Sequence, residues 1–172
     1  MTWAPPLRCD PTNGIWEHWK IGLKDDCIHE RPTDITFANG CCMFVKRDVI
    51  EKVGYFDEAY FHTGEDAGYS IRTMRVGDRL ICLPEARLWH RARTSTEGWG
   101  SVRDYLYYEY RNRMILWSKY FREKGSRPRV TLAKFYLRSV LSTIKKGDFG
   151  GSLAIMVGLI HGLKGIVGKR RR

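Results

Sequence analysis

Glycine residues divide the middle of this chain into short segments, and this division limits what the chain can fold into. Gly54 follows the pattern of a short helix over residues 48–53, and Gly77 follows the pattern of a second helix over residues 67–76. Glycine is favoured directly after a helix because it adopts the left-handed backbone conformation at little steric cost. The sequence therefore predicts two short helices, each with a defined end.

Short apolar runs flank these helices. Residues 35–37 and 41–45 lie on either side of an Asn-Gly pair at 39–40, and this arrangement predicts two buried strand segments that meet at a turn. Residues 79–84 and 86–89 predict two further short strands. Strands and helices are therefore both expected between residues 35 and 89.

The segment after residue 100 has a different pattern. Residues 104–122 carry aromatic side chains mostly at spacings of three and four, which predicts a long amphipathic helix. A further amphipathic helix is expected beyond Gly125, and we expect the sequence Asp-Phe-Gly-Gly at 148–151 to break it. The apolar segment 152–167 is shorter than the about 20 residues that cross a bilayer, and we expect it to lie in the membrane interface.

Positive charge is concentrated towards the C-terminus. The chain has 30 Lys and Arg residues against 19 Asp and Glu residues, a net charge of +11. From Lys119 onward there are 14 basic and 2 acidic residues, which leaves 16 basic and 17 acidic residues in positions 1–118. We therefore expect an enzyme-like body with a basic extension that meets anionic lipid headgroups or phosphates, the alternative being a solvated tail without a partner.

Cysteine usage and the first residues bear on the compartment. The five cysteines are an odd number without a Cys-x-x-Cys pair, which favours a reducing compartment over a disulfide framework or a zinc knuckle. The residues after Met1 do not form the charged and then apolar pattern of a signal peptide. We expect a cytoplasmic protein that is peripheral on the inner face of the cell membrane.

Four motifs with chemically active side chains follow one another in a fixed order. They are Asn39-Gly40-Cys41-Cys42-Met43, Glu65-Asp66, Leu83-Pro84-Glu85-Ala86-Arg87-Leu88-Trp89-His90 and Tyr107-Tyr108-Glu109-Tyr110-Arg111-Asn112-Arg113. Each alone has an ordinary structural explanation, because acidic pairs stabilise helix starts, single histidines pack in cores, and Arg and Asn among tyrosines make structural hydrogen bonds. The combination in this order is far more specific than its parts.

Together the four motifs resemble glycosyltransferase family two, which has the GT-A fold and includes rhamnosyl- and galactofuranosyltransferases. The resemblance covers about residues 35–117. It implies an α/β fold, namely a partial, Rossmann-like GT-A domain that lacks its N-terminal nucleotide-binding half. No strand–helix units and no Asp-x-Asp after a strand precede residue 35. Residues 1–124 would be the acceptor-side half of this domain, and residues 125–172 a basic, amphipathic, helical extension that associates with membranes.

The resemblance also implies roles for individual residues. Asp66, with Glu65 beside it, would be the catalytic base that accepts the proton of the acceptor hydroxyl. His90 would be a ligand of the divalent metal ion, Mg²⁺ or Mn²⁺, that neutralises the leaving diphosphate. Arg111 and Arg113 would either add positive charge near the diphosphate of the nucleotide-sugar donor or serve as structural residues. The segment from Gly40 would be a core strand beside the donor.

The function implied is inverting, metal-dependent transfer of a sugar from a nucleotide-sugar to a cell-surface polysaccharide or lipid-linked acceptor. The chain alone is expected to be inactive, and three explanations stay open: the sequence is truncated, the other half is supplied in trans, or the chain is a relic. The alternative is a noncatalytic membrane-surface module or a relic of a truncated glycosyltransferase. Nucleic-acid binding is disfavoured because the C-terminal basic residues alternate with an apolar run, and a zinc hydrolase using His62, Asp66 and His90 is disfavoured by their spacing.

Overall fold

The chain forms two compact units, and each is described by itself. The structure is a computed structural model that describes residues 7–9, 16–18, 31–86, 88, 102–122 and 126–170. The first unit consists of Met1–Asp10, Trp16–Asp57 and Glu65–Thr94. The second unit consists of Pro11–Ile15, Glu58–Gly64 and Ser95–Arg172.

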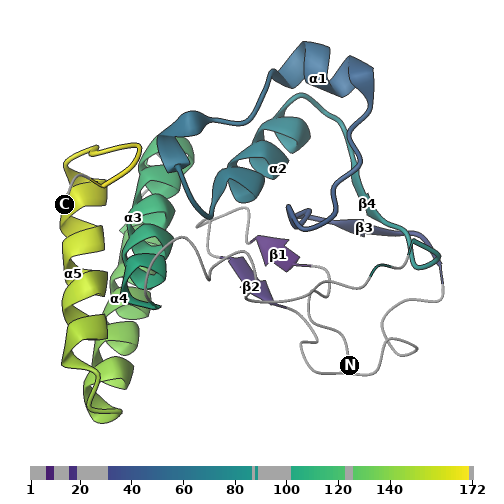
Figure 1. The fold of residues 1–172 in the computed structure, drawn as a ribbon. Coiled ribbons are helices and arrows are strands. Elements are labelled where there is room, and N and C mark those ends of the chain that lie inside the picture. Colours follow the sequence, from purple (N-terminus) through teal and green to yellow (C-terminus); the bar gives the residue numbers. More distant parts are fainter. Residues whose placement is uncertain are drawn as a thin grey trace. The chain divides into compact units, whose positions relative to one another are not determined.

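The described part of the first unit contains two small antiparallel sheets and two helices (Figure 1). One sheet pairs β1 (Leu7–Cys9) with β2 (Trp16–His18), and the other pairs β3 (Thr33–Ile35) with β4 (Leu80–Cys82). The helices are α1 (Arg47–Val53) and α2 (Glu65–Arg75). The alternation of strands and helices expected for residues 34–82 is therefore confirmed in outline.

Glycine ends both helices of the first unit, as the sequence predicts. Gly54 has a φ angle of 80° and its N–H group donates to the carbonyl of Ile50, which caps the last turn of α1. Gly77, two residues after α2, has a φ angle of 85°. No Cβ-bearing residue adopts these angles readily, so the glycines set where the two helices stop.

The expected strand over residues 41–45 is absent. Residues 40–42 form a turn and residues 43–46 have no regular structure, and the Phe44 side chain is 92% exposed. A strand requires a neighbour that pairs with its N–H and C=O groups, and the described residues provide none for this segment. The apolar run alone was not enough to make it a strand.

The second unit is helical in its described part. It contains the 3-10 turn η2 (Glu58–Tyr60) and the helices α3 (Val102–Tyr120), α4 (Ser126–Lys145) and α5 (Phe149–Leu163). Helices α3 and α5 lie side by side along most of their lengths, and α4 packs against α5 (Figure 1). Large buried side chains at this centre include Tyr107, Leu116 and Ile155.

Helix α5 begins earlier than the sequence suggested. The Asp148 side chain accepts the N–H of Gly151 at 2.8 Å and thereby caps the start of the helix. Gly150 and Gly151, which we expected in a chain break, therefore lie in its first turn. The break is confined to the three residues 146–148, because an N-cap aspartate satisfies the free N–H groups that glycines alone would leave open.

In class, the described residues are mixed α/β, with five α-helices and two two-stranded sheets. Helix α3 belongs to the second unit together with α4 and α5, whereas the boundary expected from the sequence lies after residue 124. That boundary stays a prediction. Of the strand expected at 86–89, only residues 86 and 88 are described, and neither is in a strand. None of the described helices has both the length and the apolar character needed to cross a membrane.

Candidate functional site

Asp66 lies in the first turn of α2, and backbone groups hold its carboxylate from two sides. Oδ2 accepts the N–H of Gly40 at 3.0 Å, and Oδ1 accepts the N–H of Ala67 at 2.8 Å. Gly40 is exposed and Asp66 is half-buried. The carboxylate is therefore oriented by the main chain while part of the side chain remains open to solvent.

Helix α2 is connected to the segments around it by two further sets of hydrogen bonds. Ser70 Oγ, one turn after Asp66, accepts the N–H of Ala38 at 3.1 Å. The guanidinium group of Arg72 donates to the carbonyls of Val53 and Tyr55 at 2.7 and 2.6 Å. Asp66 and Ser70 are four residues apart, so they share one face of the helix and hold residues 38–40 against it.

Glu65, the neighbour of Asp66, has an incompletely satisfied carboxylate. Its Oε2 atom is buried and has no hydrogen-bond partner among the residues that the structure describes. Buried polar atoms almost always have a partner, which can be a protein group, water or a ligand. Glu65 Oε2 is therefore the atom of the acidic pair that lacks a hydrogen-bond donor among the described residues.

Cys41 lies close enough to the Asp66 carboxylate to feel its charge. Burial raises the pKa of the Cys41 thiol, and the negative charge of Asp66 raises it further. Cys41 and Cys42 are both free thiols, and so is Cys82, in β4, whose pKa is raised by burial. A raised pKa keeps Cys41 and Cys82 protonated near neutral pH, so they are weak nucleophiles and weak metal ligands.

The predicted metal ligand cannot be placed beside this pair, because His90 lies outside the described residues. Within the described ranges, no group of three or more His, Cys, Asp or Glu side chains is arranged to hold a metal ion. Glu65 and Asp66 alone are too few ligands to define a site. The metal, and the convergence of Asp66 with His90, therefore stay predictions.

In the second unit, Arg111 lies at the centre of a separate cluster. Its side chain is fully buried and donates to the carbonyl oxygens of Gly168 at 2.6 Å and Tyr60 at 3.0 Å. The guanidinium carbon also lies 4.8 Å from the ring centre of Tyr108. Carbonyl dipoles and the aromatic face thus stabilise the buried positive charge. Arg111 joins α3 to the residues that follow α5 and to residues 58–64, which we call the 58–64 loop.

Asn112 holds the same loop through its side-chain amide. The Nδ2 atom lies 2.7 Å from each of the carbonyl oxygens of Tyr60, His62 and Thr63, and the Oδ1 atom accepts from Arg111 Nε at 2.9 Å. Asn112 is fully buried. The structural hydrogen bonds expected for Arg and Asn among tyrosines are therefore confirmed for this pair.

The 58–64 loop contains two residues in a backbone conformation that side chains disfavour. Phe61 has a φ angle of 58° and Thr63 a φ angle of 60°. Left-handed conformation is unusual for a β-branched residue such as threonine and persists only where surrounding contacts enforce it. The two N–H hydrogens of the Asn112 amide are shared among three carbonyls of this segment, and Glu109 accepts the Thr63 hydroxyl, so side chains of α3 supply that enforcement. In sequence the loop leads directly into Glu65.

Arg113 pairs with a carboxylate of its own helix. Its guanidinium group lies 2.6 Å from Glu109 Oε1, and both side chains are largely buried. The other oxygen of Glu109 accepts the hydroxyl proton of Thr63 at 2.8 Å. Arg111 and Arg113 are thus both engaged within the second unit, and a contact of either with a diphosphate stays a prediction.

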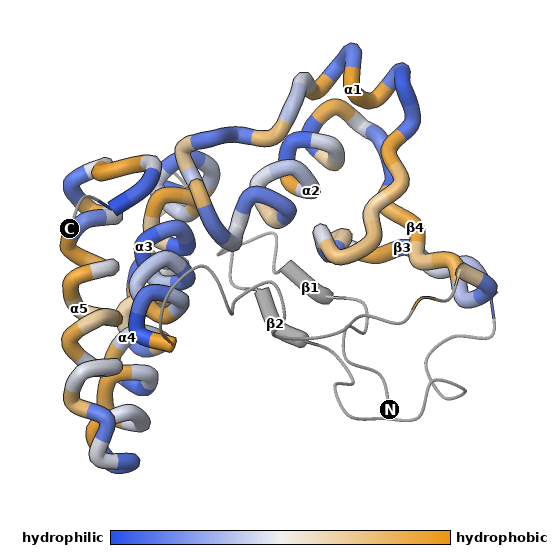
Figure 2. Tube along the Cα trace, viewed as in Figure 1, coloured by the Kyte–Doolittle hydropathy of each residue, from blue (hydrophilic) through white to orange (hydrophobic). Residues whose placement is uncertain are grey.

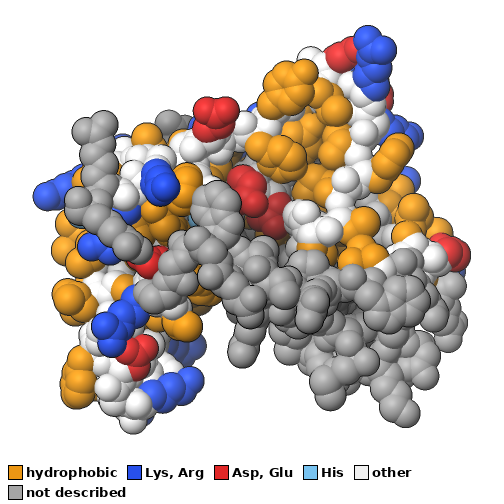
Figure 3. Space-filling view, viewed as in Figure 1, with side chains coloured by type: hydrophobic (Ala, Val, Ile, Leu, Met, Phe, Trp, Pro, Cys, Tyr) orange, Lys and Arg blue, Asp and Glu red, His pale blue; other side chains and the backbone are white. Residues whose placement is uncertain are grey.

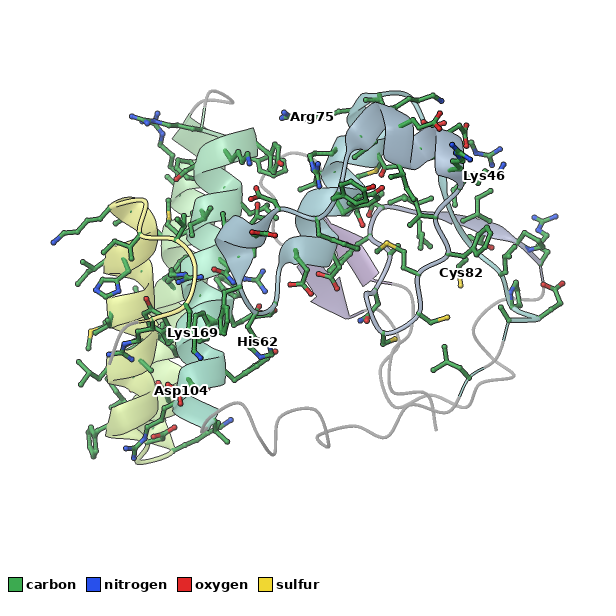
Figure 4. The ribbon with its side chains drawn as sticks, turned by 45° about the horizontal axis from the view of Figure 1, so that its top comes forward. Lys46, His62, Arg75, Cys82, Asp104 and Lys169 are labelled. Carbon is green, nitrogen blue, oxygen red and sulfur yellow. The ribbon has the colours of Figure 1, made fainter. Side chains whose placement is uncertain are left out.

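His62 projects from the loop towards α3 (Figure 4). Its ring makes edge contacts with Tyr105 and Tyr108, at centre-to-centre distances of 6.2 and 6.1 Å. Burial lowers the pKa of His62, and the carboxylate of Glu109 partly opposes this effect. The imidazole is therefore predominantly neutral near pH 7 and packs as an aromatic side chain.

The hold of α3 on the 58–64 loop was not foreseen from the sequence. The Arg-Asn pair indicated structural hydrogen bonds, but nothing in the sequence identified the carbonyls that accept them about 50 residues earlier.

In comparison with known proteins, no family model matches the chain, and no curated protein and no solved structure matches it. Membership of a family therefore stays a prediction that depends on the four ordered motifs.

Proposed function

We propose that this chain forms the acceptor-side part of an inverting glycosyltransferase with a GT-A fold, with Asp66 as catalytic base. The observation that supports it best is the carboxylate of Asp66, which backbone N–H groups of Gly40 and Ala67 orient while the residue stays partly exposed. The four ordered motifs support the reaction class. The donor is a nucleotide-sugar, and the acceptor is a glycan or a lipid-linked saccharide.

In this mechanism Asp66 accepts the proton of the acceptor hydroxyl. The hydroxyl oxygen attacks the anomeric carbon, the bond from that carbon to the nucleoside diphosphate breaks, and the configuration inverts. A divalent metal ion would supply positive charge to the diphosphate, with His90 as its proposed ligand.

The role of Asp66 is tested by replacing it with asparagine in an active preparation, in which the chain is combined with a donor-binding half. Turnover is measured as release of nucleoside diphosphate from UDP- or dTDP-sugars with Mg²⁺ or Mn²⁺. Asp66→Asn should lower kcat by about 10²- to 10⁴-fold, because the amide cannot accept the proton. Binding of the nucleotide-sugar should be unchanged, since the amide oxygen still accepts the Gly40 N–H.

Glu51→Gln is the matched control, because Glu51 is an exposed carboxylate on α1 whose side-chain partner is Arg47. The control should turn over at the rate of the unchanged chain. Normal turnover by Asp66→Asn would exclude Asp66 as the base. Loss of nucleotide-sugar binding by Asp66→Asn would assign the residue to the structure of the site and not to proton transfer.

A further inference from the structure

Helix α5 exposes a row of large apolar side chains. The side chains recur at intervals of three and four residues, and each residue is between 42% and 71% exposed. The row consists of Phe149, Leu153, Met156, Ile160 and Leu163, and we call it the α5 stripe. The helix contains no Lys, Arg, Asp or Glu. Figure 2 accordingly shows α5 mostly in orange and white, with hydrophilic residues before and after it.

The opposite face of α5 is fixed against its own unit. Gly158 and Gly162 lie directly against backbone atoms of α3, and Ile155 is 1% exposed. Ser152 Oγ lies 2.6 Å from Thr143 Oγ1 of α4. These contacts fix the rotation of the helix, so the α5 stripe cannot turn inward without breaking them. The stripe is a permanent part of the surface of the folded unit.

Helix α4 adds a second apolar row and a row of cations. The exposed apolar side chains of this helix are Val130, Leu137, Leu141 and Ile144. Lys134, Arg138 and Lys145 are exposed on the same helix, within about 100° of that row at 3.6 residues per turn. Apolar side chains bordered by cations are the pattern of helices that lie in the interface of an anionic bilayer.

The helices α4 and α5 and the residues after them carry a large excess of positive charge. Residues 126–172 contain eleven Lys and Arg residues and a single acidic residue, Asp148. The carboxylate of Asp148 caps α5 by accepting the Gly151 N–H, so it is committed to the helix start. Figure 3 shows hydrophobic side chains at the surface of the second unit with Lys and Arg side chains around them.

The positive charge of this segment indicates which kind of partner covers the α5 stripe. A second copy of the chain would bring another surface with the same excess of cations, and like charges oppose that contact. An anionic bilayer offers hydrocarbon to the stripe and phosphate to the cations, so both parts of the surface are matched. Helix α5 has 15 residues, about 22 Å at 1.5 Å per residue, which is shorter than the about 30 Å hydrocarbon layer. It therefore fits along the interface.

We propose that the α5 stripe docks on the surface of an anionic phospholipid bilayer, to which the cations of α4 and of the residues after α5 attract the second unit. The helix lies parallel to the membrane plane with its apolar side chains among the upper acyl chains. The exposed Lys134, Arg138 and Lys145 contribute to the electrostatic attraction of the unit to the lipid phosphates. This surface belongs to the second unit, and the proposal does not require that the chain transfers sugars.

Vesicle flotation with the full chain tests the docking surface. The probes are vesicles of phosphatidylcholine alone and of phosphatidylcholine with one third phosphatidylglycerol, at about physiological salt. We expect the chain to float with the anionic vesicles and at least tenfold less of it to float with the neutral ones. Raising the salt to about 1 M should reduce the anionic binding, because the Debye length falls to about 3 Å.

The double variant Leu153→Gln/Ile160→Gln removes the apolar contribution of the stripe. Both side chains are exposed, so the fold should survive, which far-UV circular dichroism and the urea midpoint verify. The variant should bind anionic vesicles at least tenfold more weakly. Phe44→Ser is the matched control, because Phe44 is 92% exposed but lies in the first unit, and its binding should equal that of the unchanged chain.

Three results would overturn the proposal. The first is a chain that stays with the soluble fraction in the presence of anionic vesicles. The second is equal vesicle binding by the folded double variant and the unchanged chain. The third is a dimer in light scattering that the double variant converts to a monomer without any vesicle binding, because the stripe would then contact a second copy.

Discussion

The side chain of Asn112 contacts three backbone carbonyl groups of one loop. Its amide nitrogen is within 2.7 Å of three carbonyl oxygens of the 58–64 loop, and the side chain is fully buried. Thr63 in that loop is held in a left-handed conformation. Three side chains of α3 therefore hold the loop, namely Asn112, Arg111 and Glu109.

We predict that Asn112→Ala destabilises the chain by about 2–4 kcal/mol. The substitution leaves the carbonyls of His62 and Thr63 without the donor they now have, and each buried unpaired group costs about 1–3 kcal/mol. Urea denaturation followed by circular dichroism measures the change. Ser142→Ala, at an exposed position of α4, is the control and should stay within about 0.5 kcal/mol.

An unchanged urea midpoint for Asn112→Ala would mean that Arg111 alone can hold the loop. Among the carbonyls of the 58–64 loop, Arg111 contacts that of Tyr60 and, at 3.5 Å, that of Ala59. It does not reach the carbonyls of His62 and Thr63, which is why we expect the amide to be needed.

At the level of elements, the packing of α5 on α3 depends on glycine. A Cβ atom on Gly158 would lie 2.6 Å from the carbonyl oxygen of Tyr107 and 3.1 Å from the backbone nitrogen of Arg111. A Cβ on Gly162 would lie 2.7 Å from the carbonyl oxygen of Arg111. Backbone atoms of a helix cannot move aside as a side chain can, so the two helices approach as closely as they do only because these positions lack a side chain.

We predict that Gly158→Ala destabilises the second unit by about 2 kcal/mol or more. Alanine is normally better than glycine inside a helix by about 1 kcal/mol, so the expected sign is opposite to that of the intrinsic preference. Gly150→Ala is the matched control, because its Cβ would meet only the end of the Arg103 side chain, which can move. Thermal unfolding should show a lower Tm for Gly158→Ala and a similar or higher Tm for the control. Equal Tm values would contradict close packing at Gly158.

The elements also show what the sequence could predict. Helices α1 and α2 were found from periodicity and their terminal glycines, because both signals are local. The strand expected at residues 41–45 was wrong, because strand formation depends on a partner that no local pattern reveals. The approach of Gly40 to Asp66 joins residues 26 apart, so the sequence supplied the acidic pair but not what orients it. His90 lies outside the described residues, and its role is untested.

At the scale of the whole molecule, residues 168–170 after α5 form hydrogen bonds with the rest of the second unit, which a solvated tail would not do. Gly168 donates its N–H to the Ala59 carbonyl at 2.9 Å and accepts from Arg111 through its own carbonyl. The N–H of Arg170 donates to the Tyr108 hydroxyl at 2.8 Å. Residues 168–170 are thus part of the second unit, although composition alone suggested a tail that only meets lipid or phosphate.

Removing residues 168–172 should therefore destabilise the second unit by about 2–4 kcal/mol. The deletion removes the Gly168 carbonyl that accepts from the buried Arg111, and bonds to charged groups are worth about 1.5–3 kcal/mol. It also removes two backbone donors. Urea denaturation measures the loss. Removing residues 171–172 alone is the control and should change the free energy of unfolding by less than about 0.5 kcal/mol. Equal midpoints for the two truncations would show that residues 168–170 are dispensable.

The glycines between α3 and α5 also restrict how these helices can move. Gly158 and Gly162 are one turn apart, and each occupies a place on α3 where no larger residue fits. A slide of α5 by one or two residues would bring Leu159 or Ile160 against the same backbone. A slide by a full turn would bring Ala154 to the place of Gly158, or Ile166 to the place of Gly162, and either residue has the Cβ atom that these places exclude. The two glycines therefore fix a single register of α5 along α3.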